Sequence, residues 1–193
     1  MKENQKLDLM IKEGRLRVNA VLSDLYKLWD EANCSAPTLI GGAVLDIIEC
    51  RKPKDYDFIN HSSSHGMVLQ DNGWELTGNT TTAMTYIKDG IIVQLLKTHP
   101  IDFDFTISLA SYNPYKNSSL APKSKGSLII DHHSYYSKVL IPCELAFKKR
   151  KNAWSTLYRI PHYQAKGYTI PTLTYHSLLS VLGKDIDRKA TCS

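Results

Sequence analysis

The spacing of hydrophobic residues divides the first fifty positions of this chain into three elements. In residues 7–33, apolar side chains recur three or four positions apart with charged residues between them, which predicts an amphipathic helix. Residues 38–40 are apolar and are followed by Gly41-Gly42, which predicts a short strand that ends in a tight turn. A brief helix is expected over 43–50.

Later segments alternate apolar and polar residues with the period of two that is typical of half-buried strands. Strands are expected over 55–59, 84–88, 91–95, 101–108 and 128–130, and a short helix over 67–73. Asp89-Gly90 separates the second and third of these strands and is a strong hairpin signal. In 101–108 the alternation is regular, so Asp102 and Asp104 are expected on the polar face of that strand.

The chain changes character toward its end. Residues 113–126 are rich in Ser, Pro, Asn and Lys and are expected to form an exposed loop. From Pro142 the sequence is helical and basic, with a run of four cations at 148–151. We therefore predict an α+β (α/β) fold with a mixed sheet of about five strands flanked by helices. It is expected to comprise a core over 1–141 and a basic helical part over 142–193.

Composition excludes several classes of protein. The 193 residues are 42% hydrophobic and 22% charged, which is typical of a globular domain and not of a disordered or collagen-like chain. No apolar run is long enough for a transmembrane helix, and the first thirty residues do not resemble a secretory signal, so no membrane partner is expected. The scattered cysteines form no CxxC pair, which favours reduced thiols in a cytoplasmic protein.

The net charge of +5 is mild, but it is distributed unevenly. Acidic residues gather at Asp55, Asp57, Asp102 and Asp104, while the basic excess lies largely beyond Pro142. This distribution allows a polyanionic partner for the C-terminal part. A solvated helix face is the other interpretation of the cations at 148–151.

Two features near residue 50 carry candidate chemistry. Asp55 and Asp57 stand two positions apart, so on a strand both side chains point to one face, where a divalent cation would relieve their repulsion. The Gly41-Gly42 turn removes side chains and leaves backbone N–H groups open to a phosphate. Because Mg²⁺ binds carboxylates together with substrate phosphates, the two features predict a metal–triphosphate site. Asp104, with Asp102 as its competitor, would complete a two-metal centre.

Residues 39–59 resemble the head motif of the DNA polymerase β-type nucleotidyltransferase superfamily. They are most similar to its branch of tRNA CCA-adding enzymes and bacterial poly(A) polymerases, which has a Gly-Gly-x-x-Arg-Asp turn-helix and then a Pro-Lys-Asp-x-Asp strand. The matching residues are Gly41, Gly42, Asp46, Lys54, Asp55 and Asp57. Phe103-Asp104-Phe105 resembles the third-acid strand of the superfamily. The length of the chain fits a compact, phage- or toxin-like member.

The resemblance implies a nucleotidyltransferase that moves NMP from an NTP to a hydroxyl acceptor, with release of pyrophosphate. It implies that Asp55, Asp57 and Asp104 are catalytic and hold two Mg²⁺ ions. Gly41, Gly42 and Lys54 are the expected nucleotide contacts, although Lys54 could also be a surface lysine beside the strand. The expected acceptor is RNA, with a tRNA 3′ end foremost, and a protein or small-molecule hydroxyl is the alternative.

Two departures from the family pattern keep another function open. Leu45 stands where the family has an arginine, and the Glu-Asp-x-x-Arg motif of the CCA-adding neck is missing. A non-catalytic relative that binds nucleotide or RNA is therefore the alternative to an enzyme. Asp46 is expected to be a helix surface charge or a hydrogen-bonded structural residue rather than a catalytic one.

Overall fold

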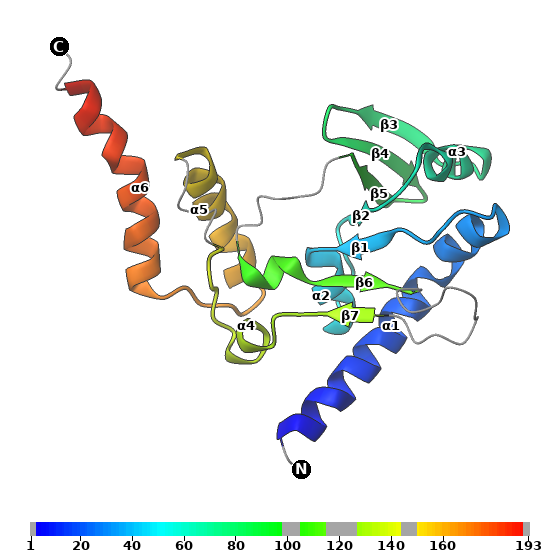
Figure 1. The fold of residues 1–193 in the computed structure, drawn as a ribbon, viewed down its shortest axis with the longest axis horizontal. Helices are drawn as coiled ribbons and strands as arrows, with labels where there is room; N and C mark the ends of the chain where they lie inside the picture. The colour runs from blue at the N-terminus through cyan, green and yellow to red at the C-terminus, as the bar shows by residue number, and fades with distance from the viewer. Residues whose placement is uncertain (1–2, 98–104, 115–126, 144–149, 191–193) are drawn as a thin grey trace. The chain divides into compact units, whose positions relative to one another are not determined.

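A computed structural model describes residues 3–97, 105–114, 127–143 and 150–190 of the chain (Figure 1). Contacts within the chain divide it into two compact units. The first comprises Met1–His99 and Ala110–Ile129, and the second comprises Pro100–Leu109 and Ile130–Ser193. The second unit thus takes in a short segment from the middle of the sequence.

The first unit is a mixed sheet with three helices (Figure 1). The helices are α1 (Glu3–Glu31), α2 (Gly42–Ile48) and α3 (Ser63–Asp71). The strands are β1 (Thr38–Ile40), β2 (Tyr56–Ile59), β3 (Glu75–Asn79), β4 (Ala83–Lys88), β5 (Ile91–Leu96), β6 (Ser111–Asn113) and β7 (Ser127–Ile129). They form one sheet in the order β3-β4-β5-β2-β1-β6-β7, in which β2 and β5 are parallel and the other neighbours antiparallel. The α+β class and the mixed sheet are confirmed, with seven strands instead of about five.

Helix α1 packs along the sheet unit through a narrow stripe of buried residues. Gly14 and Val18 belong to this stripe and Trp29 lies near its C-terminal end. A Cβ added at Gly14 would lie 3.1 Å from the Ile48 side chain and 3.3 Å from that of Leu128. Glycine therefore lets α1 approach α2 and β7 closely, and larger residues there would push the helix away.

An aromatic cluster holds strand β2 against α1. The ring of Phe58, which is fully buried, lies 5.2 Å from the Trp29 ring and 6.1 Å from the Tyr26 ring, in edge-to-face geometry. A one-residue slip of β2 would expose Phe58 and bury its neighbour Asp57. The aromatic cluster consequently fixes the register of this strand.

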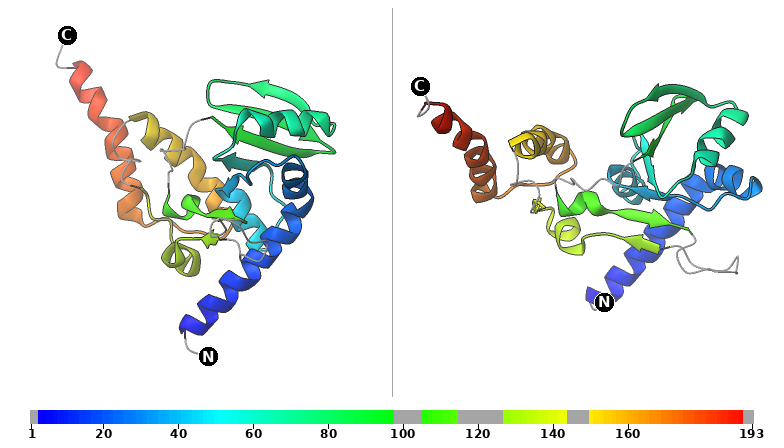
Figure 2. Two further views of the ribbon diagram at one scale, coloured as in Figure 1. Left: turned by 45° about the vertical axis from the view of Figure 1, so that its right-hand side comes forward. Right: turned by 45° about the horizontal axis from the view of Figure 1, so that its top comes forward.

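The hairpin predicted at Asp89-Gly90 is confirmed. Asp89 and Gly90 have φ values of 51° and 73°, and Lys88 and Ile91 pair directly across the turn. Positive φ at both central residues is the type I′ geometry, whose twist matches that of the strands. Figure 2 shows β3, β4 and β5 as a twisted antiparallel group beside α3.

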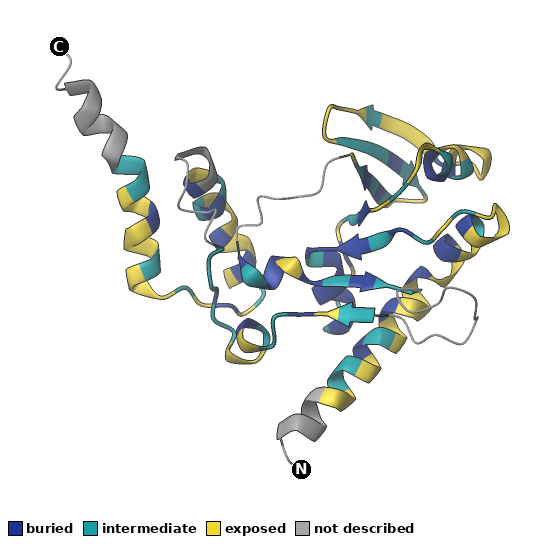
Figure 3. Cartoon of the chain, in the orientation of Figure 1, coloured by how far each residue is buried: buried dark blue, intermediate teal, exposed yellow. Residues whose placement is uncertain are grey.

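The second unit is helical. It contains the 3₁₀ helix η1 (Thr106–Leu109) and the helices α4 (His132–Ser137), α5 (Arg150–Gln164) and α6 (Thr172–Ala190). Figure 3 shows that α5 and α6 each combine buried and exposed positions. The helical, basic character expected beyond Pro142 therefore corresponds to α5 and α6.

The strand predicted over 101–108 is wrong for its second half. Residues 106–109 form η1, in which the Ser108 N–H donates to the Phe105 carbonyl. The alternation of apolar and polar residues suggested a strand with a solvent-facing polar side, but the polar side chains of Thr106 and Ser108 form hydrogen bonds inside the protein. The Thr106 hydroxyl donates to Asp131, and the Ser108 hydroxyl lies 2.6 Å from that of Tyr163 in the buried interior. Residues 101–104, including Asp102 and Asp104, lie outside the described residues.

Two negative findings concern the described part of the chain. None of its helices combines the length and apolar character that a membrane span needs. Cys34, Cys50 and Cys143 carry free thiols, in agreement with the absence of a CxxC pair.

Candidate functional site

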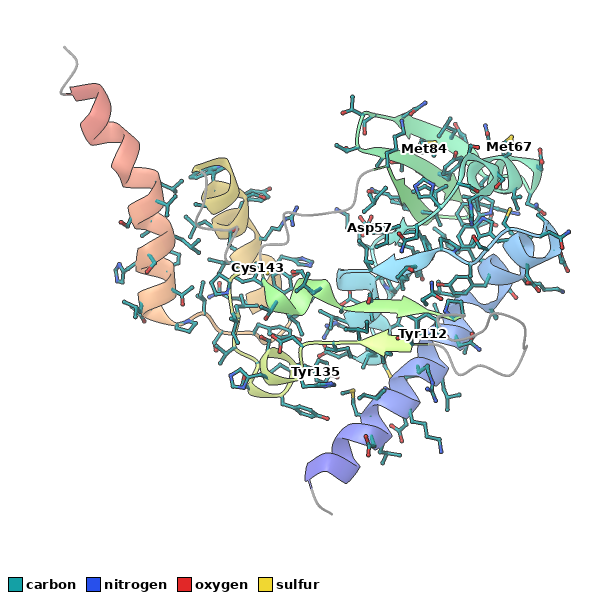
Figure 4. All side chains as sticks on the ribbon, in the orientation of Figure 1. Asp57, Met67, Met84, Tyr112, Tyr135 and Cys143 are labelled. Carbon is teal, nitrogen blue, oxygen red and sulfur yellow. The ribbon has the colours of Figure 1, made fainter. Side chains whose placement is uncertain are left out.

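The sheet brings the glycine turn and the acidic pair together. Strand β1 runs antiparallel to β2, and Ile40, its last residue, pairs with Asp57. Gly41 follows Ile40 directly, and Asp55 directly precedes β2. The end of β1 and the start of β2 thus lie at one edge of the sheet, which brings Gly41 and Asp55 together although they are 14 positions apart in the sequence. Figure 4 labels Asp57 at this position on β2.

The face on which Asp57 lies follows from its neighbour in the chain. Phe58 points into the aromatic cluster under α1, so the alternation of the strand places Asp57 on the opposite face. Asp57 and Asp55 are both half-buried. The Oδ1 atom of Asp57 is itself buried, so only part of this carboxylate pair is open to solvent, and neighbouring strands hold its backbone.

Strand register adds two polar residues to the surroundings of Asp57. Gln94 on β5 pairs with Asp57, and Thr85 on β4 pairs with Gln94 in turn. Paired residues on adjacent strands lie on one face of a sheet, so Asp57, Gln94 and Thr85 form a polar row. The sequence analysis missed this row. Its only signal was Gln94, a single polar residue inside the apolar run 91–95.

Gly41 adopts a backbone conformation that other residues avoid. Its φ is 77° and its ψ is −145°, and its N–H donates to the Ala110 carbonyl over 2.7 Å. A Cβ at this position would meet no atom within 4 Å, so the requirement for glycine is conformational rather than steric. The turn lets α2 begin at Gly42 immediately after β1.

Two arginines hold the far end of α2. Arg17 on α1 donates to the Ile48 carbonyl over 2.6 Å. The backbone N–H of Arg51 donates to the Asp46 carbonyl over 2.7 Å. These bonds satisfy carbonyl groups that a helix end leaves unpaired, and they fix where the chain leaves α2 toward Asp55.

Asp46 takes part in an ion-pair network with Arg51 and Glu49. The Arg51 guanidinium bonds the Asp46 carboxylate over 2.9 Å and also pairs with Glu49. Burial alone would lower the pKa of Arg51, but the hydrogen bond to Asp46 and the charge of Glu49 outweigh it and raise the pKa. Asp46 is nearly buried, as a structural residue would be. Leu45, which stands at the position of the family arginine, is fully buried in the core.

The remaining candidate residues differ in exposure. Lys54 is exposed on the approach to β2, whereas the following Asp55 is half-buried. Tyr56 is also half-buried, and burial raises the pKa of its hydroxyl. Among the described residues no three metal-ligating side chains gather in one place. The described part of the site therefore offers the carboxylates of Asp55 and Asp57, and Asp104 lies outside it.

These two carboxylates fit Mg²⁺ in kind. This ion keeps several waters and commonly binds one or two carboxylates together with substrate phosphates, rather than a full cage of protein ligands. Two half-buried oxygen donors beside a turn free of side chains match that requirement.

Comparisons by sequence alone find no relative for this chain. No protein-family model matches it. No curated protein matches it either. The fold therefore carries the comparison with known proteins.

Several solved structures share the fold. The CCA-adding enzyme of Thermotoga maritima, complexed with tRNA, aligns over 92% of this chain and 45% of its own, with a TM-score of 0.65 and 17% identity. A tRNA nucleotidyltransferase complexed with a primer tRNA and an incoming ATP analog aligns over 84% and 51%, with a TM-score of 0.60 and 13% identity. A CCA-adding enzyme with CTP aligns over 89% and 42%, with a TM-score of 0.60 and 16% identity.

The comparison confirms the resemblance at the level of the fold. The alignment spans most of this chain, far beyond the motif at 39–59 that carries the resemblance in sequence. The chain spans about half the length of the solved structures that it matches. Its fold is thus the nucleotidyltransferase-like α+β fold found in part of those larger proteins.

Proposed function

We propose that this protein is a Mg²⁺-dependent nucleotidyltransferase, which moves NMP from an NTP to a hydroxyl of RNA, with a tRNA 3′ end as the first candidate. The observation that carries the proposal is the pairing of Ile40 with Asp57, because it joins the glycine turn and the acidic pair at one sheet edge. Solved proteins of the same fold are complexed with tRNA, with CTP or with an ATP analog. The proposed catalytic core comprises residues 1–141.

In this reaction the acceptor hydroxyl attacks the α-phosphorus of the NTP. The new phosphorus–oxygen bond forms as the bond to the bridging oxygen breaks, the hydroxyl proton passes to solvent, and pyrophosphate leaves. Mg²⁺, when bound, would make the hydroxyl more acidic and neutralise charge on the phosphates. Asp55 and Asp57 would hold the ions, with Asp104 as the proposed third carboxylate.

The other candidate residues would act on the nucleotide. The Gly41-Gly42 turn presents backbone without side chains beside the acids, so a phosphate could approach there. Exposed Lys54 precedes Asp55 and could pair with a phosphate as a point charge. Because Leu45 carries no charge where the family pattern has an arginine, any cationic contact with the nucleotide must come from another residue of this chain.

Transfer of label from each of four α-labelled NTPs to tRNA and to total RNA, in the presence of Mg²⁺, tests the proposal. The variant Asp57→Asn keeps the shape of the side chain and removes its charge. It should lower the transfer rate by about a thousandfold, which corresponds to a loss of several kcal/mol in transition-state stabilisation. Asp71→Asn, which removes an exposed acid at the end of α3, is the matched control and should keep full activity.

Three outcomes would overturn the proposal. They are transfer that persists in Asp57→Asn, the absence of transfer from every NTP, and label that lands on protein or a small molecule instead of RNA. Melting curves of the wild type and both variants should coincide, which separates a loss of chemistry from a loss of folding.

A further inference from the structure

Helix α5 carries two aromatic residues on the side that does not pack. Its buried positions, Ala153, Thr156 and Ile160, recur three or four residues apart and define the packed side. Trp154 and Tyr158 lie on the opposite side, 65% and 80% exposed. A solvent-facing side of a helix is normally polar, so two large rings there call for a functional explanation.

The two rings share one face of the helix. They stand four positions apart, which is a rise of about 6 Å along the axis with a small rotation. Helix α6 of the same unit contacts α5 but leaves both rings exposed. Two exposed rings with this spacing lie on neighbouring turns of one helix face.

The charge of the surrounding sequence indicates what these rings bind. From Leu145 to Lys184 the chain has no Asp or Glu and seven Lys and Arg. The rest of the chain contains the other 17 Lys and Arg and all 19 Asp and Glu, so its net charge is −2. The whole positive balance therefore lies in the segment that includes α5. Cations attract phosphates, and exposed aromatic rings stack on unpaired bases.

We propose that Trp154 and Tyr158 form a stacking platform for unpaired bases of single-stranded RNA. Every base has a flat face, so this recognition would tolerate different sequences. The choice of RNA as the ligand rests on the proposed function. The stacking itself requires neither an NTP nor nucleotidyl transfer. A second copy of the chain or another protein would cover the rings without a requirement for bases.

Intrinsic fluorescence offers a direct test, because Trp154 is the exposed one of three tryptophans. Trp29 and Trp74 are buried. The full chain, with a chelator and without NTP, is titrated with a single-stranded RNA of mixed sequence and with an abasic strand of equal length. RNA with bases should quench the Trp154 emission, and the abasic strand should not.

Affinity measurements on variants complete the test. Trp154→Ala and Tyr158→Ala should each weaken binding of the RNA by about 5- to 150-fold and leave binding of the abasic strand unchanged. Trp154→Phe keeps a ring and should restore most of the affinity. Tyr136→Ala, which removes a 46% exposed ring on α4 of the same unit, is the matched control and should have no effect.

Equal losses on both strands, or no loss on either, would overturn the platform. So would sedimentation data in which the rings mediate self-association while RNA binding is unchanged in the variants. The Asp57→Asn variant should bind RNA as the wild type does. If the wild type binds RNA through its bases but transfers no nucleotide, the proposed function is refuted and the platform stands. If the wild type transfers nucleotide but Trp154→Ala and Tyr158→Ala lose no base-dependent affinity, the platform is refuted and the proposed function stands.

Discussion

Two groups of acidic side chains lie within twelve positions of the chain and have opposite surroundings. Asp46 and Glu49, at 11% and 12% side-chain exposure, share the guanidinium of Arg51. Asp55 and Asp57 are half-buried at the start of β2, and among the described residues no Lys or Arg forms an ion pair with Asp55.

The difference distinguishes acids that stabilise the fold from the acids that we propose for catalysis. A protein neutralises a buried carboxylate internally, since an unpaired one would cost several kcal/mol. Half-buried carboxylates at the start of a strand can instead bind a cation together with water and substrate oxygens. The motif resemblance includes both Asp46 and the Asp55–Asp57 pair, and the structure assigns Asp46 to the ion-pair network.

The first prediction concerns the replacement of one acid from each group by asparagine. Asp55→Asn should lower nucleotidyl transfer by about a thousandfold and leave the free energy of unfolding unchanged or slightly higher, because it removes a like charge beside Asp57. Asp46→Asn should lower the free energy of unfolding by about 1–3 kcal/mol, because Arg51 loses a charge-assisted bond. Transfer assays and urea unfolding of the same two variants check both expectations.

The distinction between the two groups of acids would be wrong if the two variants showed the opposite effects. A strong loss of transfer by folded Asp46→Asn would place this acid in the chemistry. A large loss of stability in Asp55→Asn would mean that the strand-edge acids support the fold.

Local patterns were sufficient to predict some elements. Strand β1 begins and ends where the sequence places it, because an apolar run met a glycine pair. The hairpin was predictable because Asp89-Gly90 specifies its turn without help from the rest of the chain. Strand β2 begins one residue after the predicted start, at Tyr56.

Elements that depend on distant partners were not predictable from such patterns. Helix η1 replaces a predicted strand because Thr106 and Ser108 bond residues far along the chain. Strand β6 and helix α4 have only three and six residues, too few to show a period. In the candidate site, Gln94 and Thr85 join Asp57 through strand pairing, which local spacing does not encode.

The second prediction concerns the cation that serves the structural acids. Arg51→Met should lower the free energy of unfolding by about 1–2 kcal/mol, a discounted figure because the Arg51 side chain is 36% exposed. In a double-mutant cycle with Asp46→Asn, the two losses should add to more than the loss of the double variant. Urea unfolding of the four proteins gives the coupling energy, and additive losses would show that the two side chains do not act as a pair.

The third prediction extends the comparison to a structural acid in the second unit. Asp131 caps the N-terminus of α4 and accepts hydrogen bonds from the hydroxyls of Thr106 and Ser134 and from the His133 N–H. Burial acts to raise the pKa of Asp131, but these hydrogen bonds outweigh it, so the pKa lies below its ordinary value of 3.8. A pKa lower in the folded than in the unfolded protein contributes stability above pH 3.8 that is lost as the pH falls through the folded value.

Asp131→Asn should therefore destabilise the protein at neutral pH and lose this deficit in acid. Asparagine keeps the cap at the start of α4 but not the charge, so a cost of about 1 kcal/mol or less is expected at pH 7. As the pH falls from 3.8 through the lower pKa of the folded state, Asp131 of the wild type becomes protonated too, and the two unfolding curves should converge. Asp30→Asn, which changes an exposed acid on α1, provides the control for the general effect of acid. A difference between wild type and Asp131→Asn that stayed constant from pH 7 to the acid limit would contradict the assignment, because it would show that the bonds of Asp131 do not depend on its charge.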